Sequence, residues 1–252
     1  MTRDGVNPSE FNTLGCRELV PYNVQWRRVG VSGISRLKAG FRVRLADGTS
    51  ERTRFVLLAT GVVDELPQIA GVEECYGRSV FHCPYCDGWE WRDRRIAVVG
   101  RNATGAAKLA LSLVTWSPDV VFCTNGVRLE RRMAGRLRRN GVTIRVEPVS
   151  RLVHSRGMLE RIDFKDSEAE PCDVLFFTTG QHQQNALAMR LGCEFNTRGT
   201  VKTGTLSDTC VPGVFVAGDA SRDAQFIAVA VGEGLKAAVA INQALQRETL
   251  RP

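Results

Sequence analysis

Two cysteines three residues apart carry the clearest chemistry in this sequence. Cys83 and Cys86 lie within the segment HCPYCDG, residues 82–88. In a helix, residues at this spacing share one turn, within the separation that a disulfide bridges. Pro84 favours the first turn of a helix, where unpaired backbone N–H groups make a thiol ionise more readily. We therefore predict that the pair cycles between dithiol and disulfide, and that Asp87 handles the proton.

Two other interpretations of the pair stay open at this point: half of a zinc site, or two buried thiols. Zinc needs four ligands, and His154 and His182 stand alone in the sequence. His82 could lower the pKa of a neighbouring thiol, although capping the end of a strand is its simpler role. We predict no metal site, because no second close pair occurs among the remaining cysteines: Cys16, Cys75, Cys123, Cys172, Cys193 and Cys210.

The composition is that of a globular protein with a substantial core. The chain has 252 residues, of which 43% are hydrophobic, and this length suits two modest domains. Its apolar runs are too short to span a membrane, and residues 1–5 lack the apolar core of a signal peptide. We therefore predict a cytoplasmic protein with no membrane partner. In a reducing compartment, one close cysteine pair is better explained by catalysis than by structure.

The net charge of +7 comes mostly from arginine. Nucleic-acid binding needs more than positive charge, and we find no interleaved aromatic residues and no known reading motif, so we predict no nucleic-acid partner. An exposed helix face explains the charge, and that face could attract an acidic partner. The arginines concentrate at Arg128, Arg131, Arg132, Arg136, Arg138 and Arg139.

The order of apolar runs predicts an α/β protein with parallel strands between helices. Glycine and aspartate mark the turns between the first runs, as in Ala46-Asp47-Gly48. The pattern predicts strands at 28–34, 41–45, 55–59, 95–99, 119–124, 142–146, 173–178 and 214–217, a hairpin at 149–164, and helices at 103–114 and 224–246. Two strands end alike, in Ala59-Thr60-Gly61 and in Thr178-Thr179-Gly180, which suggests two related nucleotide-binding units.

Taken in order, these pieces resemble the thioredoxin reductase-like flavoproteins, which belong to the pyridine nucleotide-disulfide oxidoreductases and include a branch of small dithiol oxidases. The matching pieces are FVLLATG with Leu66-Pro67, then residues 82–88, then residues 96–105, and finally GVFVAGD at 213–219. The resemblance implies two Rossmann-like domains, one split around the other. The FAD domain would comprise residues 1–78 and 198–252, and residues 79–197 would form an NAD(P)-like domain that carries the redox cysteines.

The resemblance also assigns cofactor contacts. Asp219 would bind the polar chain that joins the flavin to its diphosphate, and Gly218 would let the backbone approach it. Near the same FAD would lie residues 59–61 (Ala59, Thr60 and Gly61), while Gln225 and Phe226 would lie near the flavin ring. Cys86 would be the cysteine nearer the flavin, and Cys83 would meet the substrate.

The second nucleotide site is irregular. In Gly100-Arg101-Asn102-Ala103-Thr104-Gly105, Asn102 replaces the middle glycine of a Gly-x-Gly-x-x-Gly turn, although Gly100 and Gly105 are present. No acidic residue ends the next predicted strand, where a ribose partner is expected. Arg128, Arg131 and Arg132 could reach a 2′-phosphate, so NADPH stays an alternative electron partner.

The resemblance places a further strand, Gly-x-Gly-x-x-Gly turn and helix ahead of the first residue, roughly 30 residues or more. Because that turn receives the cofactor diphosphate, we expect this chain alone to bind FAD weakly.

Three functions follow from these observations. The first is a flavin-dependent thiol/disulfide oxidoreductase, similar to thioredoxin-disulfide reductase, that acts on a thioredoxin-like protein or a small-molecule dithiol. The second is an oxygen-dependent dithiol oxidase. The third is a flavin-free module that senses redox state or binds a partner without catalysis. The resemblance adds the expectation of a homodimer.

Overall fold

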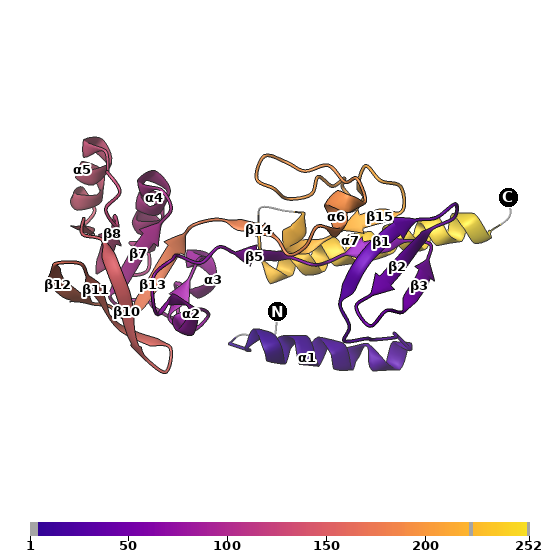
Figure 1. Cartoon of the computed structure of the whole chain (residues 1–252), viewed down its shortest axis with the longest axis horizontal. Helices are drawn as coiled ribbons and strands as arrows, with labels where there is room; N and C mark the ends of the chain where they lie inside the picture. The colour runs from indigo at the N-terminus through magenta and orange to yellow at the C-terminus, as the bar shows by residue number, and fades with distance from the viewer. Residues whose placement is uncertain (1–4, 222–223, 251–252) are drawn as a thin grey trace. The chain divides into compact units, whose positions relative to one another are not determined.

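The computed structural model describes residues 5–221 and 224–250 (Figure 1). The chain divides into two compact units, residues 1–56 and residues 57–252. The predicted domain boundaries after residues 78 and 197 stay predictions, because a division into compact units does not test which segments form one nucleotide-binding domain.

The first unit combines one helix with a small antiparallel sheet. Helix α1 (Pro8–Glu18) begins at Asn7, whose side chain accepts a hydrogen bond from the Ser9 amide, and a short 3₁₀ turn, η1 (Val20–Tyr22), follows. The sheet contains β1 (Val31–Arg36), β2 (Phe41–Leu45) and β3 (Ser50–Thr53) in that order. The first predicted strand therefore lies about three residues too early, whereas the second is confirmed, and α1 and β3 were not predicted.

The second unit is built around a five-stranded parallel sheet. Its order is β6-β13-β7-β8-β9, and every neighbouring pair is parallel. The order reverses at β7, from which the chain first moves outward to β8 and β9 and then returns to β13 on the other side. The strands are β6 (Val80–Phe81), β7 (Ile96–Gly100), β8 (Val120–Cys123), β9 (Thr143–Arg145) and β13 (Val174–Thr178).

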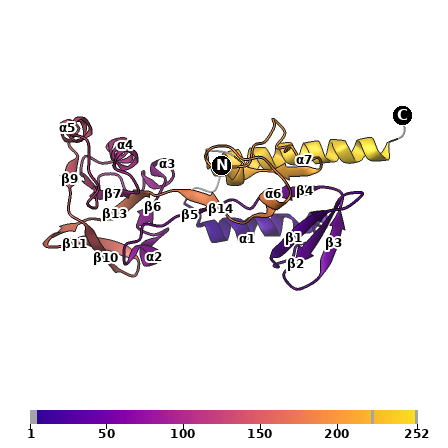
Figure 2. The ribbon, with the colours of Figure 1, turned by 45° about the horizontal axis from the view of Figure 1, so that its top comes forward.

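Side chains of this sheet alternate between two cores, as the period of a strand requires. Ile96 and Val98 belong to the core under the helices α4 (Ala103–Leu113) and α5 (Arg131–Arg139). Ala97 and Val99 belong to the opposite core, which the strands after β9 cover. In Figure 2, α4 and α5 lie on one face of β7 and β13. Strands β10 and β11 lie on the other face. This burial on both faces explains why the predicted strands here are continuous apolar runs.

The covering strands form an antiparallel layer of β10 (Val149–Ser155), β11 (Met158–Phe164) and β12 (Ser167–Pro171). Their first turn has positive φ at both Arg156 and Gly157, and a Cβ at Gly157 would lie 2.5 Å from the Glu74 carbonyl oxygen. The Ser79 hydroxyl donates to the Gly157 carbonyl at 2.7 Å and so fixes the turn to the main sheet. The predicted hairpin at 149–164 is confirmed.

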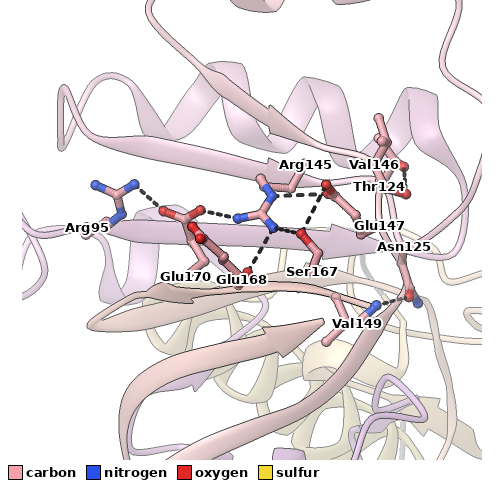
Figure 3. Close-up of polar contacts among 10 residues, drawn as sticks. All are labelled: Arg95, Thr124, Asn125, Arg145, Val146, Glu147, Val149, Ser167, Glu168 and Glu170. Carbon is pink, nitrogen blue, oxygen red and sulfur yellow. Dashed lines mark hydrogen bonds and ion pairs between the residues drawn. The ribbon is translucent and has the colours of Figure 1, made fainter. Parts of the chain in front are cut away.

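A polar network joins this layer to the main sheet at the opposite end (Figure 3). Glu170 of β12 is 9% exposed and accepts from both Arg95 and Arg145, the latter at 2.6 Å. The Arg145 guanidinium also donates to Ser167 at 2.9 Å and lies 4.2 Å from the centre of the Phe164 ring. Two arginines that share one carboxylate therefore hold three strands and the start of β7 together.

The other elements of the second unit are short, apart from the last helix. Helix α2 (Val72–Cys75) lies before β6, α3 (Pro84–Asp87) lies after it, and α6 (Leu187–Arg190) follows β14. Strand β5 (Val62–Asp64) pairs antiparallel with β14 (Gln181–Gln183), and β4 (Val56–Leu58) pairs with β15 (Val214–Val216). After the 3₁₀ turn η2 (Gly218–Ala220) comes α7 (Ile227–Thr249), three residues later than predicted. No described helix has both the length and the apolar character needed to cross a membrane.

Candidate functional site

The two cysteines at 83 and 86 are joined by a disulfide, with their Cα atoms 5.3 Å apart. Cys83 is the residue before α3, Pro84 is the first residue of that helix, and the Cys83 carbonyl accepts from the amides of Cys86 and Asp87, both at 3.3 Å. The local sequence thus forms the single turn that its spacing predicts. Cys83 is half-buried and Cys86 is exposed, so a substrate thiol can approach this unit of the chain at the disulfide.

Asp87 ends the same turn and has the properties of a proton carrier. Its side chain is half-buried, and that burial raises the pKa of its carboxyl to about 6, with repulsion from Glu90 adding to the shift and His82 opposing it. A carboxyl that titrates this close to neutral pH can both give and accept a proton at working pH.

A buried carboxylate that the sequence did not single out binds the side chain of the residue before Cys83. Asp64, the last residue of β5, is 7% exposed at its side chain and lies 3.0 Å from His82 Nδ1. The hydroxyl of Tyr76 donates to the same carboxylate, and Gln181 Nε2 donates to it at 2.6 Å. His82 directly precedes Cys83, so this carboxylate connects β5, β14 and the redox turn.

The strand ends assigned to FAD come together. Leu58 of β4 and Ala217 after β15 share a hydrogen bond of 3.0 Å, which brings Ala59, Thr60 and Gly61 next to Gly218 and Asp219. Gly61 has a φ of +66°, and apart from its chain neighbours no described residue comes within 4 Å of the position that a Cβ would take. These segments therefore meet at one place and leave open space beside the backbone.

Asp219 is the polar group at this place. Its half-buried carboxyl has no hydrogen-bond partner among the described residues, and burial raises its pKa while His82 opposes that effect. Because an open acceptor and an open glycine suit the hydroxyls and the diphosphate of a dinucleotide, the residues present fit FAD. Phe226 is 44% exposed at the start of α7. Gln225 instead exchanges two hydrogen bonds with Gln181, at 2.9 and 2.6 Å.

A cavity of about 540 Å³ lies at the carboxyl ends of β7 and β8, where open α/β sheets bind nucleotides. Gly100, Arg101 and Thr179 line it. One backbone donor at the start of α4, which follows β7, is already used. Asn102 Oδ1 accepts from the Gly105 amide at 2.7 Å, which is the kind of helix N-terminal N–H group that a diphosphate uses.

The charged and polar side chains of this cavity are bound in the same way. The Arg101 guanidinium pairs with Glu65, which also lines the cavity, and Asn125 Oδ1 accepts from the Val149 amide at 2.8 Å. A diphosphate would have to displace Asn102 and compete with the Glu65 carboxylate. Two groups that could hold a diphosphate, the Gly105 amide and the Arg101 guanidinium, are therefore already bound within the chain, and we derive no step through a nicotinamide dinucleotide.

The predicted arginine face lies beside this cavity. Arg128, Arg131 and Arg138 line a second cavity of about 640 Å³ that Val127 shares with the first. These arginines follow β8, and the reach of Arg128, Arg131 and Arg132 toward a 2′-phosphate stays a prediction.

Comparison with known proteins decides the family. The model of the pyridine nucleotide-disulphide oxidoreductases matches residues 24–234. The chain belongs to this family. TrxB of Bacillus anthracis, assigned as a thioredoxin reductase, superimposes with a TM-score of 0.93 at 30% identity, over 99% of this chain and 85% of that one. HlmI gives a TM-score of 0.92 at 32% identity, over 99% and 79% of the two chains.

Relatives in sequence agree with the structural neighbours. A thioredoxin reductase of Gibberella zeae is 26% identical over 97% of this chain and 83% of its own length. A component of the alkyl hydroperoxide reductase of Pseudomonas putida is 28% identical over 79% of this chain and 40% of its own length. The predicted resemblance is therefore confirmed, and so is an α/β fold like that of thioredoxin reductases. This chain is a thioredoxin reductase-like oxidoreductase by homology.

Proposed function

We propose that this protein is a flavin-dependent thiol/disulfide oxidoreductase that acts through Cys83 and Cys86. The observation that carries the proposal is the disulfide at the start of α3, which lies beside a carboxyl, Asp87, with a pKa of about 6. Its substrate would be a thioredoxin-like protein or a small-molecule dithiol, the two partner classes that the redox pair suits.

The exchange needs both cysteines. A substrate thiolate attacks one sulfur, the bond between Cys83 and Cys86 breaks, and a mixed disulfide forms. The second substrate thiol then displaces the bound cysteine, so the substrate leaves as a disulfide and the chain holds two thiols. Asp87 accepts the proton of the attacking thiol and returns it to the departing one. FAD, held by Gly61, Gly218 and Asp219, would supply the two-electron acceptor or donor that completes the cycle.

The test replaces each cysteine in turn with serine. The chain is incubated with FAD, dialysed and examined for a flavin absorption band, and the oxidation of dithiothreitol is then followed in air, where O₂ is the two-electron acceptor and is reduced to H₂O₂. Cys83→Ser and Cys86→Ser should both lose turnover, because a lone thiol stops at the mixed disulfide. Cys210→Ser, which changes an exposed cysteine outside the pair, is the matched control. Turnover in both single variants would overturn the proposal. A wild-type chain that stays colourless and inactive, but whose Cys83 and Cys86 are still reversibly reduced and oxidised, would favour the flavin-free module.

A second candidate, an oxygen-dependent dithiol oxidase, is favoured by the end of β7, where Asn102 accepts from the Gly105 amide and Glu65 pairs with Arg101, so that these two groups are not free for a diphosphate. The overall reaction would convert a dithiol and O₂ into a disulfide and H₂O₂, with two electrons and two protons transferred. Anaerobic mixing separates the candidates. Flavin reduction by a dithiol but not by NADPH, with peroxide formed in air, would support the oxidase, whereas rapid reduction by NADPH would support a reductase.

A further inference from the structure

Two cysteines outside the redox turn meet in the second unit of the chain. Cys193 follows α6, and Cys210 precedes β15. Each sulfur contacts a residue next to the other cysteine. The Cys193 thiol donates to the Thr209 hydroxyl oxygen at 3.8 Å, and the Cys210 thiol donates to the Gly192 carbonyl at 3.5 Å. The two cysteines are therefore neighbours in space, although a whole loop separates them in sequence.

The two thiols differ in which reagents can reach them. Cys193 is only 7% exposed, whereas Cys210 is exposed. Burial raises the pKa of the Cys193 thiol, the hydrogen bond to Thr209 opposes that shift, and Cys210 adds to it. A small oxidant in solution therefore meets Cys210 first, and Cys193 stays a protected thiol until its neighbour has reacted.

The backbone lets the two sulfurs close the remaining gap. With 3.5 Å between Cys210 Sγ and the Gly192 oxygen, ordinary bond lengths keep the Cα atoms of Cys193 and Cys210 within about 9 Å. A disulfide needs roughly 4.4–6.8 Å. The Cys193 amide donates to the Ala188 carbonyl at 3.0 Å, but the backbone of Cys210 makes no hydrogen bond to any residue that the structure describes. Cys210 can therefore move the short distance that the bond requires.

These contacts give the pair a role of its own. We propose that Cys193 and Cys210 are a second redox pair, which a hydroperoxide closes into a disulfide that clamps the segment after α6 to the segment before β15. Cys210 is the thiol that reacts with the peroxide, and Cys193 is the resolving thiol. The inference goes beyond the proposed function, since it requires neither FAD nor turnover at Cys83 and Cys86.

The reaction has two balanced steps. The Cys210 sulfur attacks one oxygen of hydrogen peroxide, the O–O bond breaks, and a sulfenic acid and water form. The Cys193 sulfur then attacks the Cys210 sulfur, the S–O bond breaks, and a disulfide and a second water form. In each step the thiol proton leaves in the water. Two electrons thus pass from the two thiols to one peroxide.

The clamp acts on the loop that supports β15. The Thr209 amide, next to Cys210, donates to the Val214 carbonyl at 3.2 Å, and β15 leads directly to Asp219. A covalent link here closes a loop of the chain and so lowers the entropy of its unfolded state. The oxidised protein should therefore be harder to unfold.

The test follows which thiols a measured dose of hydrogen peroxide consumes in the full chain. Catalase removes the excess, N-ethylmaleimide caps the free thiols in denaturant, and mass spectrometry follows trypsin digestion without reductant. The wild type should give peptide 191–198 joined to peptide 203–222, two hydrogen atoms lighter than their sum. In Cys193→Ser, irreversible sulfinic acid at Cys210 should exceed the wild-type level about tenfold, because no thiol resolves the sulfenic acid.

Three control variants isolate the pair. Cys210→Ser should leave peptide 191–198 as a free thiol. Cys16→Ser, which changes a partly exposed cysteine of α1, is the matched control and should give the same linked peptide as the wild type. The double variant Cys83→Ser, Cys86→Ser should form the link equally well. Loss of turnover in that variant therefore tests the proposed function, whereas loss of the link would overturn this inference.

Thermal unfolding gives a second readout. The linked chain should have a Tm about 5–10 °C above that of the untreated wild type, whereas peroxide should not raise the Tm of Cys193→Ser. An unchanged or lower Tm in the linked chain would overturn the clamp. Three other results would overturn the pair itself: no linked peptide from a chain with unchanged circular dichroism, Cys210 linked to another chain, or equal sulfinic acid in the wild type and Cys193→Ser. Cys193→Ala gives the same comparison if serine at this buried position prevents folding.

Discussion

Two places in the second unit carry glycines that are expected at nucleotide sites, but their polar side chains differ in whether they already have hydrogen-bond partners. At the ends of β4 and β15, Gly61 has open space beside it and the Asp219 carboxyl has no partner among the described residues. At the end of β7, Asn102 binds the Gly105 amide and Glu65 binds Arg101. A glycine-rich turn is therefore not enough to define a nucleotide site. The neighbouring side chains decide whether the donors and acceptors are available to a ligand.

The largest expected effect concerns Asp219, at the ends of β4 and β15. Asp219→Ala removes the acceptor that a dinucleotide would bind, and because a hydrogen bond to a charged group contributes about 1.5–3 kcal/mol, FAD affinity should fall about 10- to 100-fold. Titration of the chain with FAD, followed by flavin fluorescence, measures this. Glu73→Ala changes an exposed carboxylate on α2 and serves as the control. Equal affinity in wild type and Asp219→Ala would remove the contrast between the two ends.

The second prediction concerns the end of β7, where Asn102 and Glu65 bind the Gly105 amide and Arg101. The double variant Glu65→Gln, Asn102→Gly frees the Arg101 guanidinium and the Gly105 amide, so its affinity for NADPH should rise by at least about tenfold. Isothermal titration with NADPH makes the comparison, with Glu73→Gln as the control. Tight NADPH binding by the wild-type chain would show that Asn102 and Glu65 move aside readily.

The third prediction uses pH to titrate Asp219, at the ends of β4 and β15. Burial raises the pKa of Asp219, so its carboxylate is lost at a higher pH than that of an ordinary aspartate. As pH falls from about 7 to about 4, FAD should leave the wild-type chain before it leaves a chain whose acceptor does not titrate, such as Asp219→Asn. Flavin fluorescence after gel filtration at each pH gives the bound fraction. Parallel release curves for the two chains would contradict the role of Asp219 as acceptor.

The smallest expected effect concerns how much Asn102, as the N-cap of α4, contributes to the folding free energy. Asn102 is the N-cap of α4, and its replacement by alanine should cost about 1 kcal/mol of folding free energy, while glycine should cost only a few tenths. For a chain of this size, that corresponds to a fall in Tm of about 2–4 °C for the alanine variant. Thermal unfolding followed by circular dichroism measures both. A Tm equal to that of the wild type in both variants would mean that the cap contributes nothing.

The parts of this molecule that could be predicted are those whose signal is local. Buried on both faces, β7 is one apolar run, and the redox turn is specified by the cysteine spacing and Pro84. The Asp64 cluster could not be predicted, because Tyr76 and Gln181 lie 12 and 117 residues from Asp64 and meet it only in the folded chain. Strands β5 and β14 were missed since three-residue strands, one of them Gln-His-Gln, carry no period.

Glu170 with its two arginines has a bearing on protein engineering. The carboxylate on β12 is shared by Arg95, which precedes β7, and by Arg145 of β9. Removing one member leaves a charge buried without its full complement, which costs far more than the loss of an exposed pair. A chimera that transplants β10 to β12 from a relative must therefore import Arg95 and Arg145 as well. In this chain the layer depends on residues outside it, so recombination breakpoints are best placed outside residues 95–170.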